Sequence, residues 1–512
     1  MSESMEPELS ELQTVRLDKV REFRNAGVEP YPTRSRRTHT TAETVDLFES
    51  DEGEGAAEHV VAVGGRITAI RHMGKTIFVQ VRDGYGTIQL YLRKDELGEE
   101  RFAEFLHLFD LGDWVQASGS LFRTKTGEIS VRSREVTMLS KALNAPPDKY
   151  HGLQDIEIRY RQRYADLIAN AEVRRIFEIR SKLVSAFRDY LDSHGYLEVE
   201  TPVLQPLYGG AAARPFTTHH NALDQTFYLR IADELYLKRL IVGGFERVYE
   251  IAKDFRNEGV DRNHSPEFTM LEFYEAFADY TTMMERVQGL VRAASERIFG
   301  GQVFETQGHL IDLSGDWPRI TLRQAILDKS GVDYTQHPDQ PSLLAAARAA
   351  GADVDHTTVW PRIVDELLKQ FVRPNLIQPT FLIDYPVQLS PLAKRKLDDP
   401  THAERFQLYI AGGELANAFT ELNDPIDQWS RFVEQQRDKD AGDLDAMPID
   451  RDFINALMYG MPPTGGVGIG IDRITMIFAD QTTIRDVILF PAMRNLPAGD
   501  PAGSFAHDVG SE

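Results

Sequence analysis

The segment FRNEGVDRNHSPEFTMLEFYEAF, residues 255–277, gathers side chains that can do polar chemistry. If EFTMLEFYEA is a strand, its alternation places Phe268, Met270, Glu272 and Tyr274 on one face. A carboxylate and a phenol beside an aromatic ring make a poor hydrophobic core but a good pocket wall. Arg256, just before the loop, could bridge a carboxylate and a phosphate. The loop itself adds further charged candidates: Glu258, Arg262 and His264.

The segment GVGIGIDR, residues 466–473, alternates glycine along one face of a predicted strand. Missing side chains at alternate positions let a flat ligand lie against the strand. Arg473 then stands at the start of the following helix, where it suits a phosphate. A bulged core strand is the alternative interpretation, and the glycines alone do not decide between the two.

The segment IAGGELANAFTELND, residues 410–424, spaces Glu414, Asn417 and Glu421 so that at least two of these side chains converge in a helix or a strand. Carboxylates beside a nucleotide suggest magnesium, whereas carboxylates elsewhere usually form a solvated face. The MGKT segment at 73–76 does not complete a P-loop, because Ala69 stands where that motif requires glycine.

The elements that position these residues fall into two parts. Residues 9–26 predict a short amphipathic helix, and residues 60–143 predict short alternating strands with one helical insert, which is typical of an OB-type barrel. In the barrel hairpin, the side chains on one face of the two strands are apolar and are predicted to form the core: Ile77, Val79, Val81, Ile88, Leu90 and Leu92. The opposite face carries Phe78, Gln80 and Arg82 beside Gln89 and Tyr91. This face is either a platform for unstacked bases or the polar side of an ordinary amphipathic hairpin.

The longer second part is mixed. A helix at 171–194, a strand at 196–204, an antiparallel pair at 246–256 and 267–277, and a strand leading into a helix at 466–478 indicate an α+β fold. We therefore predict five regions: an N-terminal helix and acidic linker at 1–59, an OB-type barrel at 60–143, a linker at 144–158, an α+β domain with an antiparallel sheet and flanking helices at 159–496, and a flexible tail at 497–512.

Composition limits the possible functions. The 512 residues are 42% hydrophobic and 27% charged, with no cysteine, which excludes disulfides and cysteine-bound zinc. No segment has the length and apolarity of a membrane span or the layout of a signal peptide, so we expect a cytoplasmic protein with no membrane association. The net charge of −22 argues against nonspecific coating of nucleic acid, although a local basic patch would still bind it.

Taken together and in this order, the motifs resemble those of the class II aminoacyl-tRNA synthetases, and closely those of the lysyl-tRNA synthetases of subgroup IIb. GYLEVETPVL with Pro202 is similar to motif 1, FRNEGVDRNHSPEFTMLEFY to motif 2, and GVGIGIDR to motif 3. GGAAARPFTTHHNALD and ADELYLKRLIVGGFERVYEI are similar to blocks typical of the lysyl enzymes. The resemblance spans residues 10–494. It implies that residues 60–143 form an OB-fold anticodon-binding domain and that residues 159–496 form a class II catalytic domain.

The resemblance implies a ligase that activates L-lysine with ATP to lysyl-adenylate and transfers it to the 3′-terminal adenosine of tRNA(Lys). Arg256 would hold the lysine carboxylate and the α-phosphate, and Glu258 the adenine amino group. His264 would lie near the distal phosphates, while Phe268 and Arg473 would enclose adenine. Arg256 and Arg473 are the implied catalytic residues.

The implied lysine pocket has Glu234 for the α-amino group and Tyr274 and Glu421 for the ε-ammonium. Three further residues would complete it: Glu272, Asn417 and Phe419. In the barrel, Phe78 and Gln89 would read the central anticodon base and Glu128 a flanking one. Motif 1 implies a homodimer.

The resemblance also implies Mg²⁺, two or three ions with ATP, of which Glu414 would hold one. The family usually carries glutamate seven residues earlier, where this sequence has Gln407, whose amide oxygen can bind magnesium but brings no charge to the metal. Three rival interpretations stay open: a non-enzymatic tRNA-binding paralogue, a ligase that transfers lysine to a protein, and an aspartyl or asparaginyl synthetase. The non-enzymatic role is opposed by the presence of the ATP-site residues Arg256, Glu258, Phe268 and Arg473. The barrel opposes the protein-modifying ligase, and the pocket carboxylates oppose an aspartyl or asparaginyl synthetase.

Overall fold

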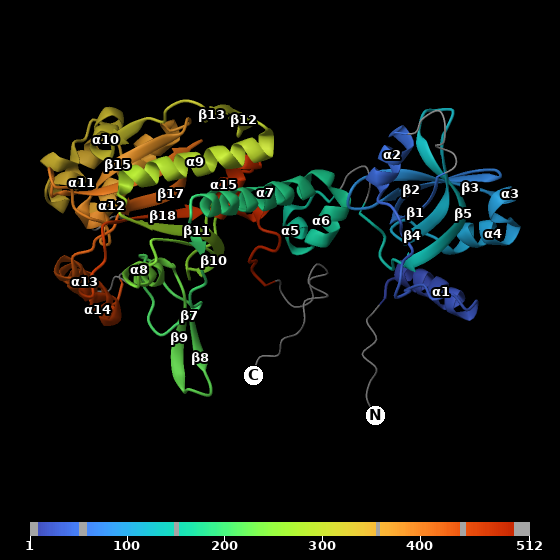
Figure 1. Ribbon diagram of the computed structural model, residues 1–512, viewed down its shortest axis with the longest axis horizontal. Coiled ribbons are helices and arrows are strands. Elements are labelled where there is room, and N and C mark those ends of the chain that lie inside the picture. The colour runs from blue at the N-terminus through green and yellow to red at the C-terminus, as the bar shows by residue number, and fades with distance from the viewer. Residues whose placement is uncertain (1–8, 51–58, 148–152, 355–358, 441–446, 496–512) are drawn as a thin grey trace. The chain divides into compact units, whose positions relative to one another are not determined.

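The computed structural model describes residues 9–50, 59–147, 153–354, 359–440 and 447–495. The chain divides into two units, Met1–Leu153 and Gln154–Glu512 (Figure 1). The predicted tail and most of the predicted acidic linker lie outside the described residues, as do residues 148–152 of the linker predicted at 144–158. None of the described helices is long and apolar enough to cross a membrane.

The first unit is a closed five-stranded barrel, as predicted, with the strand order β1-β2-β3-β5-β4. The apolar side chains predicted to form its core are buried, with Ile77, Val79 and Leu90 no more than 1% exposed. The predicted N-terminal helix is confirmed: Ser10 caps it, and Phe23 packs into the barrel core. The elements are α1 (Glu11–Asn25), α2 (Thr41–Ser50), β1 (Val60–Met73), β2 (Thr76–Arg82), β3 (Thr87–Arg93), α3 (Lys94–Leu97), α4 (Glu99–Leu108), β4 (Trp114–Arg123) and β5 (Ile129–Ser140).

The second unit is built on an eight-stranded sheet in which all pairings are antiparallel except those of β14 with β15 and of β6 with β10. The predicted pair at 246–256 and 267–277 is confirmed as β10 and β11, and β18 runs into α15 as predicted. In spatial order the strands are β14 (Arg319–Thr321), β15 (Thr380–Pro386), β16 (His402–Ile410), β17 (Gly413–Thr420), β18 (Thr464–Gly470), β11 (Glu267–Ala276), β10 (Arg247–Phe255) and β6 (Leu197–Glu198).

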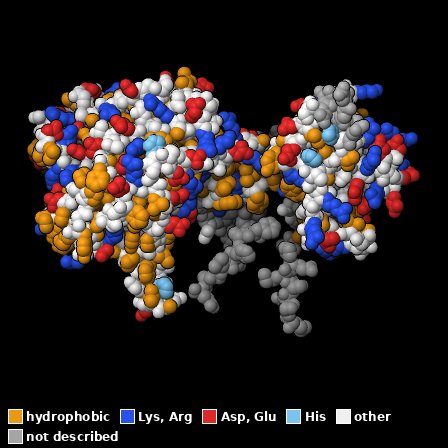
Figure 2. All heavy atoms as spheres, viewed as in Figure 1, with side chains coloured by type: hydrophobic (Ala, Val, Ile, Leu, Met, Phe, Trp, Pro, Cys, Tyr) orange, Lys and Arg blue, Asp and Glu red, His pale blue; other side chains and the backbone are white. Residues whose placement is uncertain are grey.

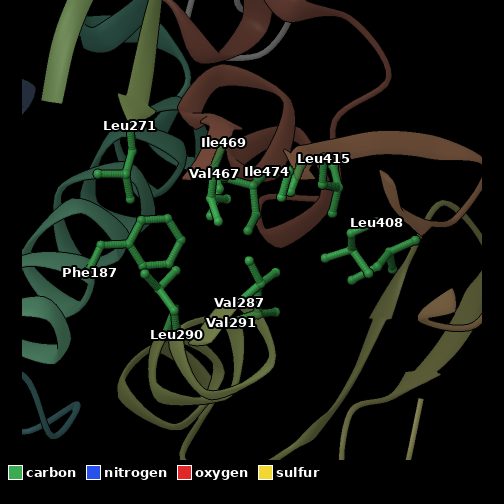
Figure 3. Packing of buried hydrophobic residues seen from close by; sticks show 14 of the residues in the cluster. Phe187, Leu271, Val287, Leu290, Val291, Leu408, Leu415, Val467, Ile469 and Ile474 are labelled. Carbon is green, nitrogen blue, oxygen red and sulfur yellow. The ribbon is translucent and has the colours of Figure 1, made fainter. Parts of the chain in front are cut away.

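Three helices, α7 (Ala171–Ser193), α9 (Tyr280–Phe299) and α15 (Ile471–Phe478), cover one face of this sheet. Figure 3 shows Phe187 of α7 and Leu290 of α9 packed toward Leu271 of β11. All three side chains are fully buried. The odd-numbered residues of β11 thus face the core, which leaves the even-numbered residues for the opposite face.

The other face carries α8 (Glu234–Val242), α13 (Pro425–Asp440) and α14 (Arg451–Met458) around a second apolar cluster that includes Val248 and Phe453. A third cluster joins the helical middle section to β15 and β16. The remaining elements are α5 (Ile156–Arg161), α6 (Arg163–Ala169), β7 (Leu204–Gln205), β8 (Thr217–His220), β9 (Gln225–Leu229), β12 (Val303–Thr306), β13 (His309–Asp312), α10 (Leu322–Ser330), η2 (Tyr334–Gln336), α11 (Gln340–Ala349), α12 (Trp360–Leu367), η3 (Leu368–Val372), η4 (Arg373–Asn375), η5 (Val387–Leu389) and η6 (Ile484–Val487).

The strand predicted at 196–204 is largely wrong. Only the two short pieces β6 and β7 are regular, because side chains satisfy the backbone between them. The N–H of Thr201 donates to Glu250 Oε2 at 3.1 Å, and Arg230 Nη1 donates to the Thr201 carbonyl oxygen at 3.2 Å. Pro202 has no N–H for a sheet ladder.

We expect Phe187→Ala to destabilise the second unit by about 3–5 kcal/mol, because a fully buried ring would leave a cavity in the core between α7, α9 and the sheet. Leu397→Ala is the control, since that side chain is 94% exposed. Urea unfolding followed by circular dichroism measures both. Equal shifts of the unfolding midpoint in the two variants would contradict this assignment of the core.

Candidate active site

A cavity of about 380 Å³ lies on the sheet face opposite α7 and α9. Its wall from β11 consists of the even-numbered side chains Phe268, Met270, Glu272 and Tyr274, as the alternation predicts. Thirteen of the side chains predicted for the site line this cavity: Glu234, Arg256, Glu258, His264, Phe268, Glu272, Tyr274, Gln407, Glu414, Asn417, Phe419, Glu421 and Arg473. Arg262, the other charged candidate of the loop, does not line it. Segments far apart in the sequence therefore form one site.

The inner part of the cavity is lined by three carboxylates that are almost completely buried. Glu234 is 7%, Glu272 6% and Glu421 1% exposed. Tyr274, 3% exposed, donates its hydroxyl to Glu272 Oε2 at 3.0 Å. Burying carboxylates is costly unless a cation or a proton compensates them, so this region is built to receive positive charge.

Gly466 on β18 creates the space for this group. A Cβ atom at Gly466 would stand 2.1 Å from Glu421 Oε1 and 2.5 Å from Tyr274 Cε1. A bulged core strand was the alternative for this segment, but β18 pairs in register with both β11 and β17. The glycine alternation thus makes room for pocket side chains as well as for a ligand.

Burial sets the protonation of the inner residues. Burial and the nearby carboxylates of Asp254 and Glu234 raise the pKa of Glu272 to about 8. Burial and the neighbouring carboxylates also hold the pKa of the Tyr274 hydroxyl well above its usual value. At neutral pH both groups therefore carry a proton in the empty cavity.

The outer part of the cavity combines cationic and aromatic groups. The Arg256 guanidinium lies 5.0 Å from the centre of the Phe268 ring, and its Nε donates to the Ile231 carbonyl oxygen at 3.3 Å. Arg473 Nη2 lies 3.3 Å from His264 Nε2. Cations above an aromatic ring suit a nucleotide, because the base can stack while the phosphates meet positive charge.

Asp472, which the sequence reasoning missed, fixes Arg473 in place. Its carboxylate accepts from Arg180 Nη1 at 2.6 Å and from the Thr269 N–H at 2.7 Å. The first turn of α15 is thereby bonded to both β11 and α7. In the sequence, Asp472 could have been noticed because it directly precedes Arg473. Its partner Arg180 could not have been identified, because it lies almost 300 residues earlier.

Gln407 and Glu414 lie on neighbouring strands, β16 and β17. Gln407 is 7% exposed, and its Oε1 accepts from the hydroxyls of Tyr385 at 2.7 Å and Tyr409 at 2.8 Å. Glu414 Oε1 lies 3.9 Å from Arg473 Nη1. The Gln407 carbonyl oxygen is thus engaged by two donors, which does not favour its predicted role as a magnesium ligand.

The donor set still fits one magnesium ion carried by a nucleotide. Mg²⁺ is usually bound by one or two carboxylates together with substrate phosphates and water. Glu414 offers such a carboxylate on the cavity wall. Among the described residues no cluster of three or more histidine, cysteine or acidic side chains could hold a metal without those phosphates.

The three predicted barrel residues form a separate cluster on the outer face of the barrel. Phe78 packs against Tyr91, with ring centres 5.3 Å apart. Glu128 accepts from Gln80 Nε2 and from Gln89 Nε2, each at 2.8 Å. Gln89 is only 3% exposed, because Glu128 and Ser130 bond to its side chain, so Gln89 is not an open part of the platform predicted for this face.

Comparison with known proteins agrees with this architecture. Residues 155–494 match the family described as tRNA synthetases class II (D, K and N), and residues 61–139 match the OB-fold nucleic acid binding domain. The chain is 54% identical over 487 residues to a lysine–tRNA ligase of Roseiflexus sp. (strain RS-1), covering 95% of this chain and 99% of that protein. It is 50% identical over 491 residues to a lysine–tRNA ligase of Pelotomaculum thermopropionicum, covering 96% of each.

These matches cover both units in the order in which the structure presents them. The large sheet carries the segments similar to motifs 2 and 3 on the wall of one cavity, and β6, from the segment similar to motif 1, lies at its edge. The chain belongs to the class II tRNA synthetases, with an OB-fold nucleic-acid-binding domain before its catalytic domain.

Proposed function

We propose that this protein activates L-lysine with ATP and transfers the lysyl group to the 3′-terminal adenosine of tRNA(Lys). The observation that carries the proposal is the set of buried carboxylates, Glu234, Glu272 and Glu421, in one cavity with Arg256. Lysine presents two ammonium groups and one carboxylate, which this set complements. The lysine–tRNA ligases to which the chain is similar support the same substrate.

Activation needs positioning and charge neutralisation more than acid–base chemistry. The lysine carboxylate is already ionised, and one of its oxygens attacks the α-phosphorus as the bond to pyrophosphate breaks. Arg256 binds the carboxylate and the α-phosphate, so that the two reacting groups are held together. Phe268 and Arg473 hold adenine between them, Glu258 accepts from its amino group, and His264 lies beside the distal phosphates.

Magnesium bound with ATP would supply further positive charge to the phosphates. Glu414 would hold one of the two or three ions. In the lysine pocket, Glu234 receives the α-amino group, Glu421 and Tyr274 the ε-ammonium, and Phe419 packs along the aliphatic chain. Glu272 and Asn417 complete the pocket. Because the reaction serves translation, a cytoplasmic location is part of this proposal.

ATP–pyrophosphate exchange, measured with each of the standard amino acids in turn, tests the proposal. We expect exchange with lysine and no comparable exchange with aspartate or asparagine. No exchange with any amino acid would favour a non-enzymatic tRNA-binding role. Exchange with lysine but no charging of tRNA(Lys) would favour transfer to a protein acceptor.

We also propose that the protein is a homodimer formed through the motif 1 region. The strand β6 ends the sheet, and apolar side chains near it are exposed: Leu197, Val203 and Leu204 are 40–49% exposed. Figure 2 shows hydrophobic side chains gathered over α8, α13, α14 and the β8–β9 hairpin. Patches of this kind often mark protein interfaces.

Sedimentation velocity at micromolar concentration tests the homodimer. We expect twice the 58.0 kDa mass of the chain, and replacing Leu197 and Leu204 by aspartate should favour the monomer, because charge would then be buried in the interface. An active wild-type protein that sediments as a monomer would rule the dimer out.

We expect Phe78→Ala to weaken charging of tRNA(Lys) while sparing ATP–pyrophosphate exchange. Losing one base-stacking ring costs about 1–3 kcal/mol, which is up to about a hundredfold in affinity. Phe78→Tyr is the matched control, because it keeps an aromatic ring and should retain charging. Equal losses of exchange and charging in Phe78→Ala would mean that the ring only supports the barrel.

Lysine binding should depend on pH through Glu272. Its pKa of about 8 in the empty cavity means that the group is protonated at pH 7, and a substrate ammonium beside it would lower that pKa. Binding below pH 8 then releases a proton, so the lysine KM should rise as the pH falls from about 8 to 6, by up to about tenfold per pH unit. Glu272→Gln should remove this dependence. A wild-type KM that stays flat over this range would contradict the assignment.

Gln407→Glu should lower the magnesium concentration needed for half-maximal exchange. The Tyr385 and Tyr409 hydroxyls can donate to one carboxylate oxygen, which leaves the second for the cavity. We expect a gain of about 1–2 kcal/mol, because water and salt screen a charge at a hydrated metal site. Gln407→Met is the control without ligand oxygens. If the magnesium dependence is the same in wild type and Gln407→Glu, residue 407 faces no metal.

A further inference from the structure

The second turn of α8 carries a lysine for which the proposed reaction has no role. Lys238 is fully buried, and its ammonium bonds to Glu234 Oε1 at 2.5 Å and to Glu421 Oε2. The Nζ atom also lies 5.4 Å from the centre of the Phe419 ring and 6.0 Å from that of Phe453. Lys238 therefore contacts three of the side chains that we assign to the substrate lysine.

Lys238 does not itself line the cavity, whereas Glu234, Glu421 and Phe419 all do. It stands behind these side chains and joins α8 to the end of β17. The two carboxylates come from distant parts of the chain, and both bond to the same ammonium. Glu421 Oε2 is held by its ion pair with Lys238, whereas Oε1 has no hydrogen-bond partner among the described residues and faces the space left by Gly466. One oxygen of Glu421 is thus fixed and the other is available.

The charges around this position define what Lys238 contributes. Burial opposes its charged form, but the Glu234 and Glu421 carboxylates outweigh burial and raise the pKa of Lys238. The other charged groups near the pocket are Glu272 and Asp254 on the sheet, Asp233 at the start of α8, Arg405 and Arg256. Arg405 is engaged with Asn417 Oδ1 at 2.8 Å, and Arg256 lies over Phe268.

We propose that Lys238 is a positioning residue for substrate selection: its ammonium ties Glu234 to Glu421 and so sets the spacing at which the pocket receives the two ammonium groups of lysine. This inference rests on the proposed function. Lys238 also balances one of the three pocket carboxylates. With Glu234, Glu272 and Glu421 ionised in the complex, the charge left over is two negative units, which matches the two ammonium groups of the substrate.

Two variants separate spacing from charge. Lys238→Met keeps an unbranched side chain of similar length but removes the ammonium, while Lys238→Arg keeps a cation of different shape. Lys141→Met is the matched control in the barrel, because Lys141 is equally enclosed and bonds to Asp110 at 2.5 Å and Asp113 at 2.7 Å. Each variant is assayed in the full-length protein by ATP–pyrophosphate exchange and by calorimetric titration with lysine in two buffers of different ionisation enthalpy.

We expect the lysine KM to rise about tenfold or more in Lys238→Met and Lys238→Arg, with the ATP KM unchanged, because both variants disturb the spacing of the carboxylates. In Lys238→Met a proton should replace the missing ammonium in the free and in the lysine-bound site alike, so at pH 7 this variant should release about as many protons as wild type when lysine binds. The Arg variant should release the same number as wild type, and Lys141→Met should leave the lysine KM unchanged.

The outcomes that overturn the inference are distinct from those that overturn the proposed function. If wild type shows no lysine-dependent exchange, the proposed function itself fails. If wild type exchanges with lysine but both variants keep its lysine KM, with at most a lower Tm, Lys238 only stabilises the fold. If Lys238→Met does not fold, the Arg variant still decides, because a wild-type lysine KM in that variant overturns the inference.

Discussion

Buried carboxylates are the constraint on which the site depends. Glu234, Glu272 and Glu421 lie in a protein interior where an uncompensated charge costs several kcal/mol. The empty site compensates them with what the chain provides, namely Lys238, the Tyr274 hydroxyl and a proton on Glu272. A ligand with correctly placed ammonium groups can replace the proton, so the cost of burying these groups becomes the source of selectivity.

The antiparallel sheet makes this arrangement possible, because it holds side chains from distant segments at fixed spacings. One face of β11 packs against α7 and α9, and the other carries Phe268, Glu272 and Tyr274. β17 and β18 bring Glu421 and Gly466 to the same place, where Gly466 leaves room that any side chain would fill. The rigid core on one face therefore positions the polar groups on the other.

Much of this could be predicted from the sequence, since alternation along a strand decides which side chains share a face. It identified the pocket wall on β11, and on the hairpin of the barrel it separated Ile77 and Val79 from Phe78. It failed where side chains replace backbone pairing, as at Thr201, whose N–H bonds to Glu250. It could not find Lys238, because a strand-and-helix pattern does not reveal that α8 meets the end of β17. The engagement of Gln407 by two tyrosines likewise depends on the register of β15 and β16.

The central claim is that the buried carboxylates select the ammonium of the lysine side chain. Calorimetric titration of the protein with lysine and with norleucine, which has the same aliphatic chain without the ammonium, tests it directly. A site built around buried polar groups rejects a ligand that leaves them unpaired by about 10⁴-fold or more. We predict that lysine binds and that norleucine binds more weakly by a factor of that order. Comparable affinities for the two would show that the carboxylates do not recognise the side-chain ammonium, and would contradict the account.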